Sequence, residues 1–328
     1  MRLVSPRVRF AVLACVFAGA LGLVGTAGAS QLIARNASHL KLAVNRKGTA
    51  LVTYSLRGKV THLLAWGAVN ARARPASARI RQVKLKLDYS GGWKHRRLVW
   101  KHFKNACQTY DGPELAWVVT ACKASNGSYW ALQSWQTALP DLGQAPWLGQ
   151  QKTWWLPLAH WTGEPAKLNV YTDWIYGGRF QEVFGQYTYQ GKGIRGFGTT
   201  RVGAPTDGYG RLLFLDTYNS SYGPGWLREN SFVSHGPPGM FCYGFYARNP
   251  WVGGYSHPGA TPNRKRGPGI GEQYRITAPG PGVTPDVMWQ GPGLHPFDKH
   301  NPADVSLESS MNAERNTIRS GYGKCSHN

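Results

Sequence analysis

The chain has 328 residues and is rich in glycine (41), proline (21) and aromatic residues (12%), which suits many short strands joined by tight turns. Long amphipathic patterns are nearly absent, and this excludes a mainly helical protein. The length allows one large β domain or two smaller ones, and the net charge is +22.

The first 29 residues have the three parts of a secretory signal peptide. Three arginines precede an apolar run from Phe10 to Val24, and Ala27-Gly28-Ala29 then forms a small-residue cleavage pattern. The run is about fifteen residues, shorter than the roughly 20 that a membrane span needs, which favours a cleaved leader over an uncleaved anchor. No later stretch is apolar enough to span a bilayer. We therefore expect an exported protein, secreted or associated with the cell envelope, whose mature chain starts near Ser30.

Positive charge is concentrated in residues 30–105. This segment holds seventeen Lys and Arg residues and a single acid, Asp88, whereas residues 106–328 are nearly balanced. Such asymmetry favours contact with a polyanion. In an exported protein the expected partner is an anionic envelope polymer, an acidic polysaccharide or a lipid headgroup surface, and not intracellular nucleic acid. The alternative is a solvated basic face that serves solubility.

Within the basic segment, glycine-containing turns separate a predicted three-stranded meander over residues 41–44, 50–56 and 60–66. Residues 83–89 alternate between apolar and charged side chains, which predicts an edge strand with Lys84 and Lys86 turned to water. These two lysines, with Arg96 and Arg97 of the following basic loop, are the predicted anion-binding residues. The segment is either a small domain or the first sheet of a larger one. A tryptophan- and glycine-rich β domain over residues 106–328 is expected to follow it.

Asn126-Gly127 predicts a tight β-hairpin, since this dipeptide supplies the positive φ angles that such a turn needs. Loss of the leader cysteine leaves four, and an even count in an exported chain predicts two disulfides. We expect Cys107–Cys122 beside the strand before the hairpin, and Cys242–Cys325 holding the C-terminal tail. The histidines are scattered and no C-x-x-C or H-x-H pattern occurs, so neither a metal site nor a cofactor is expected.

Residues 154–161 predict a strand with two different faces. One face is mostly aliphatic and typical of a core: Trp154, Leu156, Leu158 and His160. Trp155 and Trp161 share the other face, roughly 20 Å apart with small side chains between them, and form a shelf on which sugar rings could stack. Pro157 predicts that this strand lies at a sheet edge. Asn169 and Tyr171 of the next strand complete the predicted ligand-binding set. The alternative is that both indoles pack in a tryptophan-rich core.

The remaining pattern predicts further short strands and one late helix. Strands are expected at residues 167–176, 180–190, 212–215, 232–234, 240–246, 274–277 and 287–290, with a Gly/Pro-rich loop over 249–275 and a helix over 306–319. The predicted fold class is therefore all-β, an antiparallel sandwich or jelly-roll-like arrangement. A propeller is the main competitor, but the blade repeat that it requires is absent.

Four acids are candidates for catalysis, because two carboxyl groups flanking a glycosidic bond suffice for hydrolysis. They are Asp173, on the polar face of its strand, and Glu182, Asp216 and Glu229. No G-x-S-x-G nucleophile motif occurs.

These patterns favour a non-enzymatic binder of glycan or of an anionic envelope polymer. The alternatives are a secreted glycoside hydrolase and a structural surface protein without a small ligand. Acids facing each other across a groove at roughly 5–10 Å would favour the enzyme. Exposed Trp155 and Trp161 without such a pair would favour binding.

Overall fold

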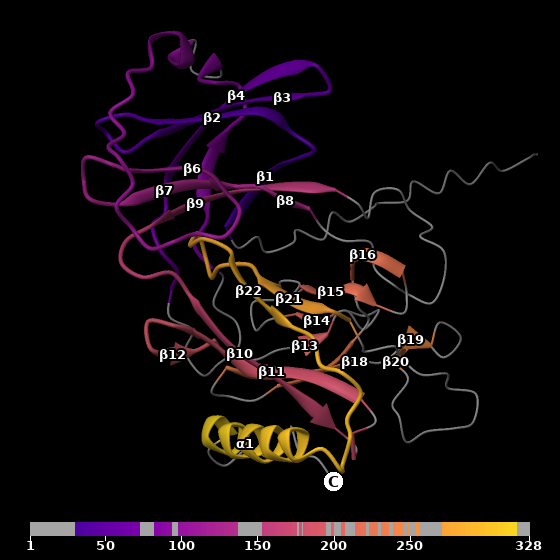
Figure 1. Ribbon diagram of the computed structural model, residues 1–328. Coiled ribbons are helices and arrows are strands. Elements are labelled where there is room, and N and C mark those ends of the chain that lie inside the picture. Colours follow the sequence, from indigo (N-terminus) through magenta and orange to yellow (C-terminus); the bar gives the residue numbers. More distant parts are fainter. Residues whose placement is uncertain are drawn as a thin grey trace, which may run out of the picture.

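The computed structural model describes residues 30–72, 82–93, 98–136, 153–175, 177–178, 180–194, 198–199, 205–206, 214–220, 223–228, 231–235, 239–245, 248–249, 254–255 and 271–319. These residues form four antiparallel sheets, two short β-ribbons and one α-helix, which confirms the all-β prediction. The sheets, named B, A, C and D, and then helix α1 are stacked in that order (Figure 1). No helix in this part of the chain is long and apolar enough to cross a membrane. The expected leader, residues 1–29, lies outside the described residues.

Sheets A and B form an N-terminal sandwich. Sheet B has the strand order β2 (Ser38–Val44), β3 (Ala50–Leu56), β4 (Lys59–Gly67) and β5 (Leu85–Asp88). Sheet A has the order β1 (Gln31–Arg35), β9 (Trp154–Trp161), β7 (Tyr129–Gln133) and β6 (Val118–Lys123), and β8 (Trp135–Gln136) also pairs with β9. A short 3₁₀ helix, η2 (Val99–His102), follows sheet B in the chain. The predicted meander and the predicted edge strand are both present.

The two sheets bury one apolar core between them. Val52 and Leu63 of sheet B and Leu132 and Leu158 of sheet A are fully buried in it. Burying an aliphatic side chain of this size contributes about 1.5–3 kcal/mol relative to leaving it in water, so the core holds the sheets together. The basic segment therefore contributes sheet B and strand β1 to a larger sandwich, and the packing does not divide at residue 105.

The hairpin at Asn126-Gly127 is present, but its turn is longer than a two-residue turn. Gly127 N–H donates to the Ala124 carbonyl (2.9 Å), and Ala124 N–H donates to the Ser128 carbonyl (2.8 Å). Of the turn residues only Gly127 has a positive φ, 81°. The Asn126 side chain accepts hydrogen bonds from the Ser128 N–H (3.1 Å) and hydroxyl (2.7 Å). This is the geometry of a three-residue loop that closes with a left-handed glycine.

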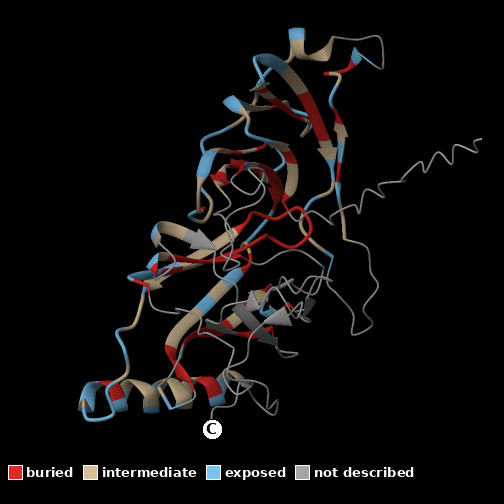
Figure 2. Cartoon of the chain, turned by 90° about the vertical axis from the view of Figure 1, so that its right-hand side faces the viewer, coloured by how far each residue is buried: buried red, intermediate tan, exposed pale blue. Residues whose placement is uncertain are grey.

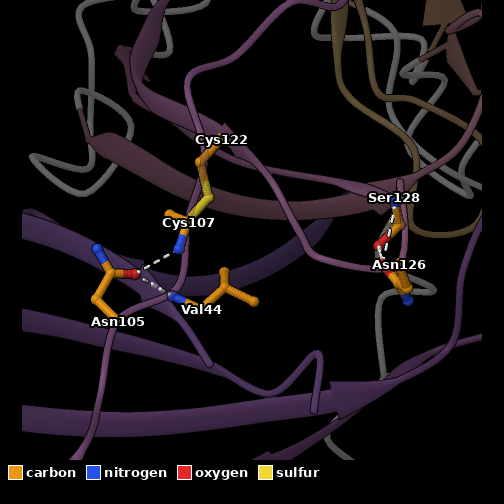
Figure 3. Close-up of a disulfide and its surroundings, with 6 residues drawn as sticks. All are labelled: Val44, Asn105, Cys107, Cys122, Asn126 and Ser128. Carbon is orange, nitrogen blue, oxygen red and sulfur yellow. Dashed lines mark hydrogen bonds between the residues drawn. A yellow bond between two sulfur atoms is a disulfide. The ribbon is translucent and has the colours of Figure 1, made fainter. Parts of the chain in front are cut away.

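The Cys107–Cys122 disulfide is confirmed, with a Cα–Cα distance of 5.5 Å. It ties the segment that leaves sheet B to strand β6 of sheet A (Figure 3). Asn105 strengthens this junction, because its side-chain oxygen accepts from the N–H groups of Val44 (3.0 Å) and Cys107 (3.1 Å). Cys242 is also disulfide-bonded, and the partner expected for it, Cys325, lies outside the described residues.

Pro157 does not mark a sheet edge, because β9 lies between β1 and β7. On one side Pro157 faces Leu32 at a β-bulge, where the register shifts between Leu32 and Ala34. On the other side it lies in the gap between the last β7 pair, at Leu158, and the first β8 pair, at Trp155. A proline at such a bulge removes no regular ladder hydrogen bond, which is why a central strand tolerates it.

Sheets C and D form a C-terminal sandwich. Sheet C has the order β16 (Gly223–Arg228), β15 (Phe214–Ser220), β21 (Gln273–Ala278) and β22 (Val287–Pro292). Sheet D has the order β10 (Lys167–Ile175), β11 (Phe180–Tyr189), β18 (Met240–Phe245) and β17 (Ser231–His235), with β12 (Lys192–Gly193) on β11. Two-residue strands pair as β13 (Gly198–Thr199) with β14 (Pro205–Thr206), and β19 (Arg248–Asn249) with β20 (Gly254–Tyr255). Val183, Leu215 and Ile276 belong to the core between sheets C and D.

Helix α1 (Pro302–Arg319) covers the outer face of sheet D and begins four residues before the predicted helix (Figure 1). Asn301 caps it, since its side-chain oxygen accepts from Ala303 N–H (3.0 Å), and Pro302 occupies the first turn, where a missing N–H costs little. Met311 and Ile318 pack against Phe184 of sheet D, and buried Arg315 lies between them on the helix.

A loop of the C-terminal sandwich is buried against the N-terminal sandwich. Ala278 ends β21, and it and all residues from Pro279 to Asp286, which lead to β22, are buried (Figure 2). The Asp286 carboxylate accepts hydrogen bonds from Trp135 Nε1 (2.9 Å), Gly280 N–H (3.0 Å) and the Ser30 hydroxyl. The Asp286 N–H donates to the side chain of Gln133 (2.8 Å). A loop without regular structure can be buried here because these contacts satisfy its polar groups.

Candidate anion-binding groove

A groove of about 1030 Å³ runs along β1 at the edge of the N-terminal sandwich. Because β1 is the outer strand of sheet A, one side of its backbone pairs with no other strand of the described chain. All residues from Gln31 to Asn36 line the groove, and the β3–β4 turn, Lys84 and Thr153 contribute the rest of the lining. The groove therefore lies where the two sheets of the sandwich leave an open edge.

The lining of the groove is positively charged. Its cations are all exposed: Arg35, Arg57, Lys59 and Lys84. No carboxylate is among the described residues that line the groove. In the part of the chain that the structure describes, none of these four side chains has an ion-pair partner. Cations of one sign gathered in a concave surface raise the local concentration of anions, so this groove is suited to a negatively charged ligand.

The only acid of the basic segment does not offset this charge. Asp88 is 5% exposed, and its carboxylate accepts hydrogen bonds from Ser90 N–H (2.9 Å), Ser90 hydroxyl (2.5 Å) and Gly92 N–H (3.1 Å). Through these hydrogen bonds the Asp88 carboxylate closes the turn after β5. The lysines and arginines of the segment therefore determine the charge of its exposed surface.

The predicted anion-binding residues have different positions. Lys84 lines the groove. Lys86 is exposed on edge strand β5, opposite Trp66, and does not line it. Arg96 and Arg97 lie outside the described residues.

The predicted aromatic shelf on β9 is wrong, because its two indoles are covered. Trp161 is fully buried and contacts the rings of Tyr110 (6.2 Å between centroids) and Tyr129 (5.5 Å). Trp155 is half-buried and packs on Trp135 (5.0 Å) and on Phe214 of sheet C (5.4 Å). Strand alternation places these side chains on one face, but the covering elements come from elsewhere in the chain.

The polar face of β10 is also not a free ligand surface. Asn169 is exposed, but Tyr171 stacks on Phe184 (5.4 Å) and its hydroxyl donates a hydrogen bond to Glu314 of helix α1, which raises the pKa of the tyrosine. The helix therefore covers the middle of the face that was expected to bind a ligand.

Two of the candidate catalytic acids are neighbours, but both are almost completely shielded from solvent. Asp173 and Glu182 face each other across β10 and β11 and are both buried. The Arg315 guanidinium, itself 2% exposed, donates to Asp173 and to Glu182 (2.8 Å). Asp216 is likewise buried and paired with Arg275 (3.0 Å), and Glu229 lies outside the described residues. Asp173, Glu182 and Asp216 are thus each buried and paired with an arginine, and none of the three lines the groove along β1.

Glu182 should make the stability depend on pH. Burial raises the pKa of Glu182 to about 7, although the Arg315 guanidinium acts the other way; Asp173 of β10 and Glu308 of α1 also interact with the Glu182 carboxyl group. The folded state binds the Glu182 proton more tightly than the unfolded state does. Glu182 therefore contributes stability that is fully present below its unfolded pKa and is lost as the pH rises through its folded pKa of about 7.

The measurement is denaturant unfolding of wild type and Glu182→Gln between pH 6 and pH 8.5. Burial lowers the pKa of His160 to about 4, which makes stability rise with pH as the unfolded histidine loses its proton, so only the difference between the two proteins isolates Glu182. Relative to the variant, wild type should lose about 1–2 kcal/mol over this range. Parallel curves would contradict the prediction.

The chain matches no protein-family model, no curated protein and no solved structure. Its function therefore has to be inferred from the arrangement of its own residues.

Sequence reasoning missed three of the four groove cations and the exposed tryptophan beside them. Arg57 and Lys59 were recognisable only as turn residues, and Arg35 belongs to a strand that was not predicted. Trp154 was assigned to the core face of β9, yet it is 49% exposed because it starts the strand, beyond the end of the core. The charge of residues 30–105 was the one available indication of this surface.

Proposed function

We propose that this is an exported, non-enzymatic protein that binds an anionic polymer in the groove along β1. The observation that carries the proposal is the lining itself, in which the described residues include four cations without an ion-pair partner and no carboxylate. The open edge of β1 adds backbone groups that can form hydrogen bonds to a ligand. A groove open along a strand admits a chain that is longer than the binding site, as a polymer requires.

The groove also distinguishes this proposal from a basic surface that serves only solubility. A diffuse positive surface would bind polyanions through its total charge, whereas the proposed site requires particular cations. Sheet B offers a matched pair of turns for this test. The β3–β4 turn has Arg57 and Lys59 in the groove, while the β2–β3 turn has exposed Arg46 and Lys47 at the opposite end of β3.

The test measures binding of polygalacturonate and of long-chain inorganic polyphosphate by the mature protein at several salt concentrations. With roughly 1 kcal/mol for each cation, Arg57→Ala/Lys59→Ala should weaken binding of both polymers about 10- to 30-fold at low salt. Arg46→Ala/Lys47→Ala removes the same charge and should change binding less than about threefold. Affinity should fall as salt rises.

Equal losses in the two double variants would assign binding to net charge and not to the groove. No binding of either polymer by wild type at low salt would overturn the proposed function.

A further inference from the structure

Trp154 is half exposed, whereas several other tryptophans of the described chain are fully used for packing. Its side chain is 49% exposed, while Trp130, Trp135 and Trp174 are exposed by 2% or less. An exposed indole lacks the burial that stabilises the buried tryptophans. Where such an indole adjoins a binding surface, its exposure favours a role in ligand binding.

Trp154 adjoins the groove directly. Its neighbour Thr153 and its partner Asn36 both line the groove. Asn36 N–H donates to the Trp154 carbonyl (2.8 Å), and Trp154 N–H donates to the Asn36 side-chain oxygen (2.9 Å). On its other side Trp154 pairs with Gln136 of β8. The indole is therefore attached to a backbone that is held from both sides, and a held ring loses little freedom when a ligand stacks on it.

Strand alternation gives the side to which the indole points. Trp154 shares a face of β9 with Leu156 and Leu158, which belong to the core between sheets A and B. The indole thus lies on the side of sheet A that faces sheet B, at the end of the strand where the core stops. The β3–β4 turn of sheet B, with Arg57 and Lys59, supplies cations to the groove on this side.

We propose that the polymer bound in the groove is an acidic polysaccharide and that Trp154 stacks on one of its sugar rings. This inference rests on the proposed function. A pyranose has an apolar C–H face that an exposed indole can cover, and a uronic acid carries its carboxylate on the same ring. The groove cations bind the carboxylates while Trp154 covers a ring. A polyphosphate chain has charge but no ring, so it engages only the cations.

The experiment compares the same two polymers on full-length mature protein carrying Trp154→Ala or Trp154→Phe. Trp154→Ala should weaken polygalacturonate binding about tenfold and change polyphosphate binding less than twofold. Trp154→Phe keeps an aromatic face and should retain most of the polygalacturonate affinity. Trp93→Ala is the matched control, because Trp93 is 66% exposed but, unlike Trp154, has a hydrogen-bond partner, Ser90, that does not line the groove, and it should leave both affinities unchanged.

The outcomes separate the two proposals. If Trp154→Ala leaves polygalacturonate binding unchanged, or weakens both polymers equally, stacking is wrong, while a loss in Arg57→Ala/Lys59→Ala keeps the groove as the anion site. If wild type binds neither polymer, the proposed function fails, and the stacking inference fails with it.

Discussion

Replacing Arg315 with methionine is expected to lower the free energy of unfolding by about 3–5 kcal/mol, because it leaves buried carboxylates without their cation. Asp173 and Glu182 both bond to this guanidinium, which is almost fully buried beneath helix α1. Methionine fills a similar volume, so the loss reports charge and not a cavity. Denaturant unfolding at pH 7 measures it.

Two further variants make this result specific. Asn316→Met, on an exposed position of the same helix, should change the stability by less than about 0.5 kcal/mol. Adding Glu182→Gln to Arg315→Met removes one of the two carboxylates that lose the Arg315 guanidinium and should recover part of the loss. If the double variant is as unstable as the sum of the single ones, the two residues do not interact and the explanation is wrong.

Replacing Asp286 with alanine should lower the free energy of unfolding by about 4 kcal/mol, the second large effect. The carboxylate satisfies Trp135 Nε1, Gly280 N–H and the Ser30 hydroxyl, and each buried donor left unpaired costs about 1–3 kcal/mol. The residue also joins the two sandwiches, because Trp135 belongs to sheet A and Asp286 immediately precedes β22 of sheet C.

The control for Asp286 is Asp298→Ala, which removes an exposed carboxylate that accepts a hydrogen bond from His300 N–H in the same turn. It should cost less than about 1 kcal/mol. Tryptophan fluorescence and far-ultraviolet circular dichroism should follow the same unfolding curve in this control. A stability of Asp286→Ala within 1 kcal/mol of wild type would show that water or other groups replace the carboxylate, and would contradict its role as the junction.

Local chemistry made much of the fold predictable. Glycine turns located β3 and β4, the Asn126-Gly127 dipeptide located the β6–β7 hairpin, and cysteine spacing located one disulfide. The strand predicted over residues 154–161 has those bounds. Each of these features depends on residues close in sequence, so a pattern of neighbours is enough to determine it.

The candidate site was less predictable, because exposure depends on distant segments. Trp155 is covered by Phe214, which lies 59 positions later, and the face of Asp173 is covered by Arg315 of α1. Strand alternation states which side chains share a face, but not which face another layer will bury.

The sequence by itself determined that this chain is β-rich, that it has a strongly basic segment of residues 30–105, and that one late helix follows the strands. Only the tertiary structure decided that Arg35, Arg57, Lys59 and Lys84 share one groove and that Trp154, not Trp155 or Trp161, stands beside it. The physical reason is that strand formation and charge are properties of short segments, whereas a groove exists only where strands far apart in the chain pack together.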